Sequence, residues 1–194
     1  EETTTVVLLK CQVTLLSLVL WTPRAHRCEL VLDDRIPDRI TSWSLWRGPE
    51  RVARHLGLAE AFDGGSSMMP DFIIIGAMKC ATSTLHDQLV QVPGVSMSDP
   101  KEPNFFSDES NWAKGMGWYQ SLFASMPPSD LKGESSTHYT KLPTYPACAQ
   151  RLHEHLPEAK LIYVMRDPVD RIVSQYIHEW SQRVIPKGCS IDDA

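Results

Sequence analysis

A lysine and three hydroxyl residues stand together where an apolar run gives way to a stretch that can begin a helix. The lysine is Lys79, and the hydroxyl residues are Thr82, Ser83 and Thr84. Free backbone N–H groups at a helix N-terminus bind anions, and a lysine beside them adds a full positive charge. The segment therefore predicts a phosphate-binding turn, although an ordinary strand-to-helix turn with Ser/Thr capping would give the same pattern in isolation.

Nucleotide hydrolysis is one chemistry that such a turn serves. A Walker A loop reads GxxxxGK followed by Ser or Thr, and that hydroxyl residue holds Mg²⁺. This segment lacks the second glycine, and Cys80 stands where the hydroxyl residue belongs. A P-loop kinase or NTPase is therefore the weaker interpretation, and it stays open as an alternative.

A second anion-binding signal lies in LIYVMRDPVDRIVSQYIHEW. An apolar run ends at Arg166, Asp167 can cap the helix that follows, and Pro168 fills the favoured first helical position. Ligands of open α/β sheets bind outside the carboxyl ends of the strands, and arginine grips phosphate with a bidentate fork. Arg166 and Ser174 are thus candidate phosphate ligands, the alternative being a surface arginine and an ordinary helical serine.

Both motifs resemble those of the sulfotransferases that use 3′-phosphoadenosine 5′-phosphosulfate. MKCATSTL is similar to their 5′-phosphosulfate loop, whose pattern is Lys, any residue, Gly, Thr, Thr or Ser, any residue, Leu. Ala81 stands where that glycine is usual, which leaves less room if the backbone needs a positive φ. The resemblance implies that Lys79 takes the charge of the bridging oxygen, and that Arg166 and Ser174 hold the 3′-phosphate. It also implies a donor-binding loop of Lys79, Cys80, Ala81, Thr82, Ser83 and Thr84.

The stretch between the motifs resembles glycan sulfotransferases of the heparan type. In KEPNFF, Glu102 occupies the position of the acidic residue that deprotonates the acceptor in that group. Without the resemblance, Glu102 would be expected to be solvated or paired with Lys101. Ser135 departs from the pattern, because several of those enzymes have a lysine there, so a contact to substrate or sulfate is missing or supplied elsewhere. The other matching residues are Lys114, Gly115, Trp118, Tyr119, Glu134, Ser136 and Tyr139.

The resemblance implies transfer of a sulfuryl group from 3′-phosphoadenosine 5′-phosphosulfate to a hydroxyl or amine, with a carbohydrate as one candidate acceptor and no metal. His86 and His138 are reserve candidates for the base, because histidine transfers protons near neutral pH. His86 is otherwise expected on a helix surface, and His138 is expected to make a structural hydrogen bond. A non-catalytic nucleotide-binding fragment is a further alternative, because sulfotransferase domains usually continue past the second motif to a late basic loop.

The elements that must position these residues alternate between strand and helix. FIIIG (72–76) and KLIYVM (160–165) predict buried strands, and residues 147–156 predict a helix closed by Pro157. We expect an α/β fold, a three-layer P-loop-type parallel sheet with flanking helices, incomplete at the C-terminus. The helix after Arg166 has an apolar stripe that predicts packing in the core. The stripe comprises Val169, Ile172, Val173, Tyr176, Ile177 and Trp180.

The linker-like stretch DGGSSMMP divides the chain. We expect residues 1–69 to be an appendage that is poorly ordered or forms short helices, with one amphipathic helix over residues 51–62. Residues 70–194 are expected to form the sulfotransferase domain. This domain is expected to be truncated, since both ends of the chain look like cuts.

Composition narrows the classes of partner. The formal net charge of −5 disfavours a general nucleic-acid coat, because phosphate backbones reward a surplus of Lys and Arg. Five cysteines without a CxxC pair favour neither a zinc site nor a disulfide framework. The apolar run 6–21 is short for a membrane span and contains Lys10 and Gln12, so a membrane anchor is not expected. A cytoplasmic location is expected, with the Golgi lumen and an N-terminal anchor as the alternative.

Overall fold

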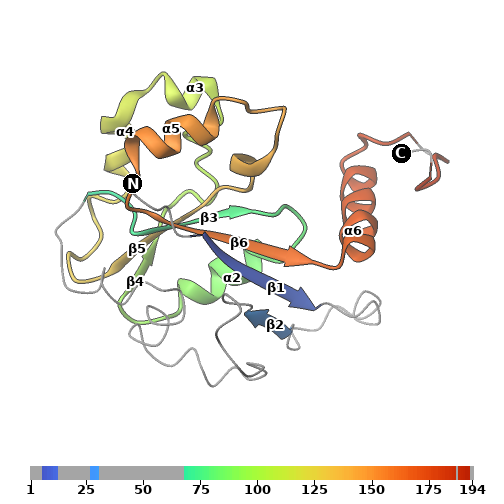
Figure 1. The fold of residues 1–194 in the computed structure, drawn as a ribbon, viewed down its shortest axis with the longest axis horizontal. Helices are drawn as coiled ribbons and strands as arrows, with labels where there is room; N and C mark the ends of the chain where they lie inside the picture. The colour runs from blue at the N-terminus through green and yellow to red at the C-terminus, as the bar shows by residue number, and fades with distance from the viewer. Residues whose placement is uncertain (1–5, 13–26, 31–67, 187, 193–194) are drawn as a thin grey trace.

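One sheet with helices on both sides forms the centre of the computed structural model, which describes residues 6–12, 27–30, 68–186 and 188–192 (Figure 1). Its strand order is β2-β1-β6-β3-β5-β4, with β1 and β2 antiparallel and the other neighbours parallel. The strands are β1 (Val6–Gln12), β2 (Arg27–Leu30), β3 (Phe72–Gly76), β4 (Val95–Met97), β5 (Leu131–Ser135) and β6 (Lys160–Arg166). The predicted α/β class with a parallel sheet and flanking helices is confirmed.

The helices cover the sheet from two sides, which gives three layers. In Figure 1, α3, α4 and α5 lie on one side of the sheet and α2 lies on the other. The helices are α2 (Thr82–Leu89), α3 (Glu109–Trp112), α4 (Gly115–Ser121), the 3₁₀ helix η4 (Thr137–Thr140), α5 (Cys148–His155) and α6 (Pro168–Ser181). The helix predicted over residues 147–156 is thus confirmed as α5.

Strand β5 does not follow from an apolar run, because LKGES is mostly polar. All five of its residues are nevertheless buried, and β5 pairs with β3 so that Gly133 faces Phe72. A Cβ atom on Gly133 would lie 2.3 Å from Cζ of Phe72 and 2.5 Å from Sδ of Met97. Glycine therefore allows β5 to lie against β3, which brings Ser135 beside the nucleotide motif that follows β3.

An aromatic cluster fills one face of the sheet and anchors the loop after β4. Phe105, Phe106 and Tyr119 are fully buried. The rings of Phe105 and Tyr119 stack with 4.7 Å between centroids, and the rings of Phe105 and Phe106 meet edge to face at 5.0 Å. Burying aromatic rings of this size is strongly favourable. The cluster thus fixes the backbone only three residues after Glu102.

The segment before residue 69 contributes strands to this sheet. β1 pairs in parallel with β6, and β2 pairs with β1. These two strands complete the hydrogen bonding at the edge of β6, and the expectation for residues 1–69 as a whole stays a prediction. The helix expected over residues 51–62 lies outside the described residues, and the boundary at residue 69 stays a prediction. Within the described part of the chain, no helix is long and apolar enough to cross a membrane.

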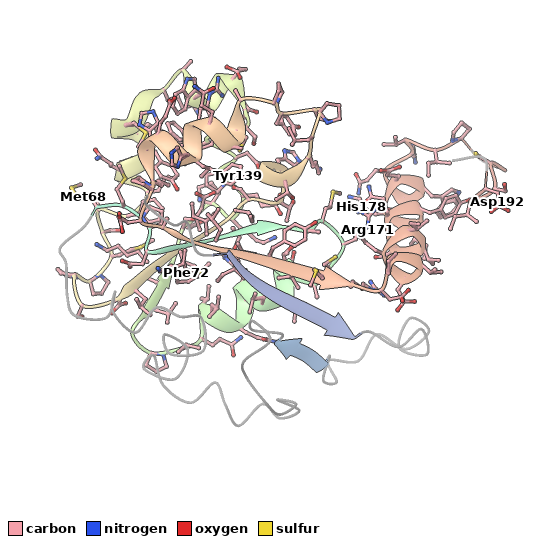
Figure 2. All side chains as sticks on the ribbon, viewed as in Figure 1. Met68, Phe72, Tyr139, Arg171, His178 and Asp192 are labelled. Carbon is pink, nitrogen blue, oxygen red and sulfur yellow. The ribbon has the colours of Figure 1, made fainter. Side chains whose placement is uncertain are left out.

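Helix α6 leaves the sheet directly after Arg166 and stands beside it (Figure 1). Its apolar stripe is largely exposed, at 67% for Val169 and 52% for Trp180, so the predicted core packing of this stripe is wrong. An amphipathic pattern shows which face of a helix is apolar, but it does not show which element covers that face. Figure 2 shows Arg171 and His178 on the side of α6 that faces the loop after β3.

Candidate functional site

The turn between β3 and α2 has an unusual backbone. Lys79 has φ 67°, and Ala81 has φ 65°, so two non-glycine residues adopt the left-handed region. No side chain caps the N-terminus of α2. The first turn of a helix carries N–H groups without intrahelical partners, and its dipole favours anions. The predicted phosphate-binding turn therefore has the backbone geometry that an anion site needs.

A guanidinium from the second motif lies against this turn. Arg166 ends β6, and its Nη1 donates a hydrogen bond to the carbonyl oxygen of Lys79 at 3.4 Å. Its Nη2 lies 4.0 Å from a carboxylate oxygen of Asp170, and the side chain is 8% exposed. The Nε atom is buried and has no partner among the described residues. A buried hydrogen-bond donor without a partner costs free energy, so the Nε side of the Arg166 guanidinium is suited to bind an anionic ligand.

Two positive groups thus lie close together. Burial and the neighbouring Arg166 lower the pKa of Lys79 below its usual value. Both effects disfavour the charged lysine, and the negative charge of an anion in the turn would offset them. The electrostatics of the turn therefore favour a ligand with several negative charges.

A cavity of about 420 Å³ joins the two motifs to the loop after β4. It is lined by Met78, Lys79, Ala81, Thr82, Ser83, Thr84, Glu102, Thr137, His138, Arg166, Ser174 and His178. Almost every predicted site residue is brought together here. Cys80 is the exception, since its side chain is buried and its N–H group donates to the carbonyl of Ala77. His178 was not predicted, although it lies one helical turn after Ser174, which is the signal that could have found it.

Glu102 is held at the cavity by the end of β5. Its backbone N–H donates to the carbonyl of Ser135 at 2.9 Å, and its φ is 57°. Thr137 Oγ1 donates to Glu102 Oε1 at 3.3 Å, and Lys101 Nζ lies 3.3 Å from the same oxygen. The side chain is 31% exposed. Glu102 therefore combines a fixed backbone with a carboxylate that solvent and substrate can reach.

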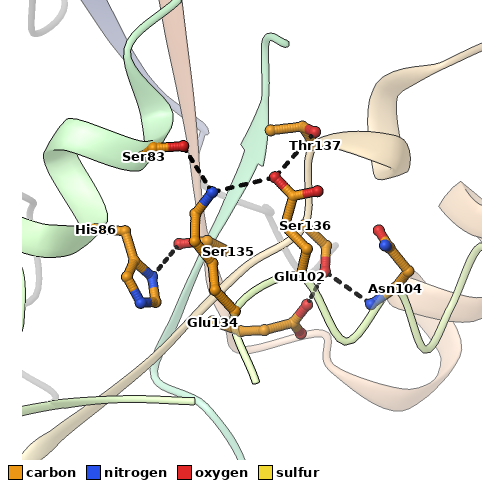
Figure 3. A network of polar contacts seen from close by, with 9 residues as sticks. Ser83, His86, Glu102, Asn104, Glu134, Ser135, Ser136 and Thr137 are labelled. Carbon is orange, nitrogen blue, oxygen red and sulfur yellow. Dashed lines mark hydrogen bonds and ion pairs between the residues drawn. The ribbon is translucent and has the colours of Figure 1, made fainter. Parts of the chain in front are cut away.

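A buried carboxylate supports this arrangement from beneath (Figure 3). Glu134 is fully buried and accepts hydrogen bonds from the hydroxyls of Tyr119 and Ser136. Ser136 Oγ in turn accepts the backbone N–H of Asn104 at 3.0 Å. Burial raises the pKa of Glu134, while the hydrogen bonds from Ser136, Tyr119 and Tyr139 oppose that rise. This network ties β5 to the loop that carries the candidate base.

The two reserve histidines have different surroundings. His86 is buried, and its Nδ1 lies 2.9 Å from Ser135 Oγ, so the expected helix-surface position is wrong. Burial lowers the pKa of His86, and nearby Lys101 lowers it further. His138 lines the cavity and stacks on Tyr145 with 5.0 Å between centroids. Burial also lowers the pKa of His138. His138 thus faces the cavity and remains a candidate for the base.

Comparisons with known proteins identify relatives of this chain. A family model described as "Sulfotransferase family" matches residues 113–189. Heparan sulfate glucosamine 3-O-sulfotransferase 3A1 of Mus musculus is 35% identical over 129 residues, which are 65% of this chain and 30% of that protein. Membrane-associated sulfotransferase kil1 of Dictyostelium discoideum is 37% identical over 117 residues, which are 59% of this chain and 24% of that protein. These matches support membership of the sulfotransferase family, with part of its domain present in this chain.

A solved structure extends the match to three dimensions. The sulfotransferase of Alicyclobacillus acidocaldarius is similar with a TM-score of 0.53 and 32% identity, over 64% of this chain and 54% of that one. Bifunctional heparan sulfate N-deacetylase/N-sulfotransferase 2 of Homo sapiens is 31% identical over 141 residues, which are 70% of this chain and 16% of that protein. The chain therefore spans less than a third of the length of the curated relatives named here.

Metal ligands do not gather in the part of the chain that the structure describes. In the ranges that it describes, no group of three or more His, Cys, Asp or Glu side chains is placed to hold a metal ion. The cavity instead offers cationic and hydroxyl groups, which suit an organic anion. The turn after β3, Arg166 and Ser174 line this cavity, and their role in holding a sulfate donor stays a prediction.

Proposed function

We propose that this chain is part of an enzyme that transfers a sulfuryl group from 3′-phosphoadenosine 5′-phosphosulfate to a hydroxyl or amine of an acceptor. One observation carries the proposal: a single cavity holds Lys79, Arg166, Ser174 and Glu102. These residues come from three separate parts of the sequence. Two cationic groups for the donor and a carboxylate for the acceptor are the parts that sulfuryl transfer needs.

In the proposed reaction the acceptor oxygen or nitrogen attacks sulfur in line with the bond to the bridging oxygen. Glu102 takes the acceptor's proton, and the new bond to sulfur forms. The bond from sulfur to the bridging oxygen breaks, and its electron pair stays on that oxygen. Lys79 stabilises the resulting negative charge, while Arg166 and Ser174 hold the 3′-phosphate of the leaving nucleotide. The product nucleotide is adenosine 3′,5′-bisphosphate.

A carbohydrate is the acceptor class that we propose. Two of the relatives above are named for heparan sulfate, which supports this choice. Glu102 lines the cavity and its side chain is 31% exposed, so an acceptor can reach it. We propose a cytoplasmic location, with an anchored protein of the Golgi lumen as the alternative. The name of the kil1 protein, which includes "membrane-associated", favours the alternative, and fractionation of cells that express the chain's parent protein would decide.

A P-loop kinase or NTPase is the competing enzyme class. It needs a hydroxyl beside the lysine to hold Mg²⁺, and the residue there is Cys80, whose thiol is buried. Burial also raises the pKa of this thiol, which disfavours the thiolate that a metal would bind. A non-catalytic nucleotide-binding fragment would keep the donor contacts and lack turnover.

Donor choice tests the proposal. Calorimetry should show that adenosine 3′,5′-bisphosphate binds more tightly than ADP or ATP, with no dependence on Mg²⁺. Arg166→Ala should weaken binding of the bisphosphate by roughly 2 to 4 kcal/mol, since it removes charge-assisted contacts. Arg183→Ala is the matched control, because Arg183 is exposed and does not line the cavity. Equal affinities for the three nucleotides, or binding that requires Mg²⁺, would favour the kinase class.

A further inference from the structure

Lys101 lies where the donor turn approaches the candidate base. Its Nζ donates a hydrogen bond to Ser83 Oγ at 2.8 Å and lies 3.3 Å from Glu102 Oε1. Figure 3 shows Ser83 on α2 and Glu102 on the loop after β4, facing each other across the gap that this ammonium bridges. Ser83 and Glu102 both line the cavity. The ammonium therefore lies at the edge of the cavity, between the place of the donor and the place of the acceptor.

The charges in the cavity give this position a consequence. Lys79 and Arg166 lie on the donor side, while the carboxylate of Glu102 lies on the acceptor side. A sulfuryl group moving toward the acceptor carries its negative oxygens toward that carboxylate. Like charges at close range repel, and the repulsion is stronger away from bulk water. An ammonium at this position offsets the repulsion.

The neighbouring position cannot supply this charge. Ser135 stands where several heparan-type enzymes have a lysine, but here it is fully buried and its hydroxyl bonds to His86. Burial lowers the pKa of His86, which favours a neutral imidazole. The pair formed by Ser135 and His86 is thus a buried structural contact. Lys101 makes a direct ion pair with Glu102, whereas the interaction of Lys141 with Glu102 is electrostatic only.

We propose that Lys101 is a further catalytic residue that contacts the sulfuryl oxygens during transfer, an inference that rests on the proposed function. In the free chain its ammonium pairs with the Glu102 carboxylate, and once the donor is bound it contacts the sulfuryl oxygens as well. When Glu102 accepts the proton of the acceptor, the carboxylate becomes neutral and no longer competes for the ammonium. The charge of Lys101 then serves the sulfuryl oxygens while the bond to the bridging oxygen breaks. Lys101 thereby links the proton transfer to the stabilisation of the migrating group.

The ordinary alternative is a surface ion pair. Lys101 is 27% exposed, and exposed ion pairs contribute little to stability. If Lys101 formed only such a pair, its removal would change the affinity for a nucleotide with a sulfuryl group and for one without it by the same factor. Comparing two nucleotides that differ in this group therefore separates a contact to sulfuryl from a general surface charge.

The test uses calorimetric affinities for 3′-phosphoadenosine 5′-phosphosulfate and for adenosine 3′,5′-bisphosphate. Lys101→Met keeps the aliphatic stem and removes the charge, and it should weaken the phosphosulfate about tenfold while changing the bisphosphate less than about twofold. Lys101→Arg should retain most of the affinity for the phosphosulfate. Lys114→Met is the matched control, because it removes the same charge from a side chain that contacts Asn111 and Trp118 and does not line the cavity.

The outcomes are separable. Equal losses for both nucleotides, or no loss for either, would overturn the role of Lys101. A loss of the same size in Lys114→Met would show an effect of net charge and would overturn it as well. Failure of the proposed function shows instead in the unsubstituted chain, as no preference for the bisphosphate over ADP. Thermal melting of each variant confirms that the compared proteins are folded.

Discussion

The left-handed backbone at Ala81 predicts a stabilising substitution. Ala81 is the N-cap of α2 and has φ 65° and ψ 26°. An L-residue with a Cβ atom loses about 1 to 2 kcal/mol in this region, whereas glycine does not. Glycine has more freedom in the unfolded chain, which offsets about 0.4 to 1 kcal/mol of that gain. Ala81→Gly should therefore stabilise the fold by up to about 1.6 kcal/mol, the largest difference between these effects, and by about 0.8 kcal/mol at the middle of the two ranges.

Differential scanning calorimetry measures this gain. For a chain of this length, 1 kcal/mol corresponds to a rise in Tm of about 2 to 4 °C. Ala149→Gly is the control, because Ala149 is exposed in helix α5, where glycine costs up to about 1 kcal/mol. Affinity for adenosine 3′,5′-bisphosphate should stay the same in Ala81→Gly, since the substitution keeps the backbone that binds the anion. If both variants lost stability alike, Ala81 would not be strained and the reasoning would fail.

Four further substitutions probe the base, the sheet and the buried carboxylate. Glu102→Gln keeps the shape and removes the base, so turnover should fall about a hundredfold or more with donor affinity unchanged. In the same assay, loss of activity only in His138→Ala would assign the base to His138. Gly133→Ala places a Cβ atom 2.3 Å from the ring of Phe72, so chemical denaturation should show a loss of about 1 to 3 kcal/mol. An unchanged denaturation midpoint would show that β5 and β3 can move apart to make room for the added Cβ atom. Burial raises the pKa of Glu134, so the folded chain keeps this proton to higher pH than the unfolded chain does. The stability due to this group therefore declines as the pH rises from the unfolded pKa through the raised folded pKa. Glu134→Gln should flatten this decline in thermal melts recorded across pH, and an unchanged slope would assign it to other groups.

The sequence predicts the two nucleotide motifs well because their geometry is local. A buried strand, a turn with Lys79 and a helix start within a few residues can be placed without knowing the rest of the fold. The same holds for Arg166, which follows an apolar run and precedes a capped helix with Pro168 at its start. The structure brings both motifs to one cavity, and the roles of their side chains stay predictions.

The rest of the site depends on contacts between distant segments. His86 lies on a helix, and only its pairing with Ser135, 49 residues later, makes it buried. Lys101 looks like a solvated neighbour of Glu102 until α2 brings Ser83 to it. Strand β5 escapes prediction because its polar residues are satisfied by partners such as Tyr119, which no local pattern reveals. Sequence periodicity contains no information on such pairings.

The contacts of Arg166 also affect how the chain divides entropy between folding and binding. An arginine side chain loses about 2 kcal/mol of rotamer entropy when it is fixed. Here the carbonyl of Lys79, the carboxylate of Asp170 and burial already restrict the side chain in the folded chain. Most of that entropy is therefore lost when the chain folds, and little remains to be lost when an anion binds. A variant that released Arg166 from Asp170 would gain side-chain freedom in the folded state, and it would bind its nucleotide more weakly although no atom that touches the nucleotide had changed.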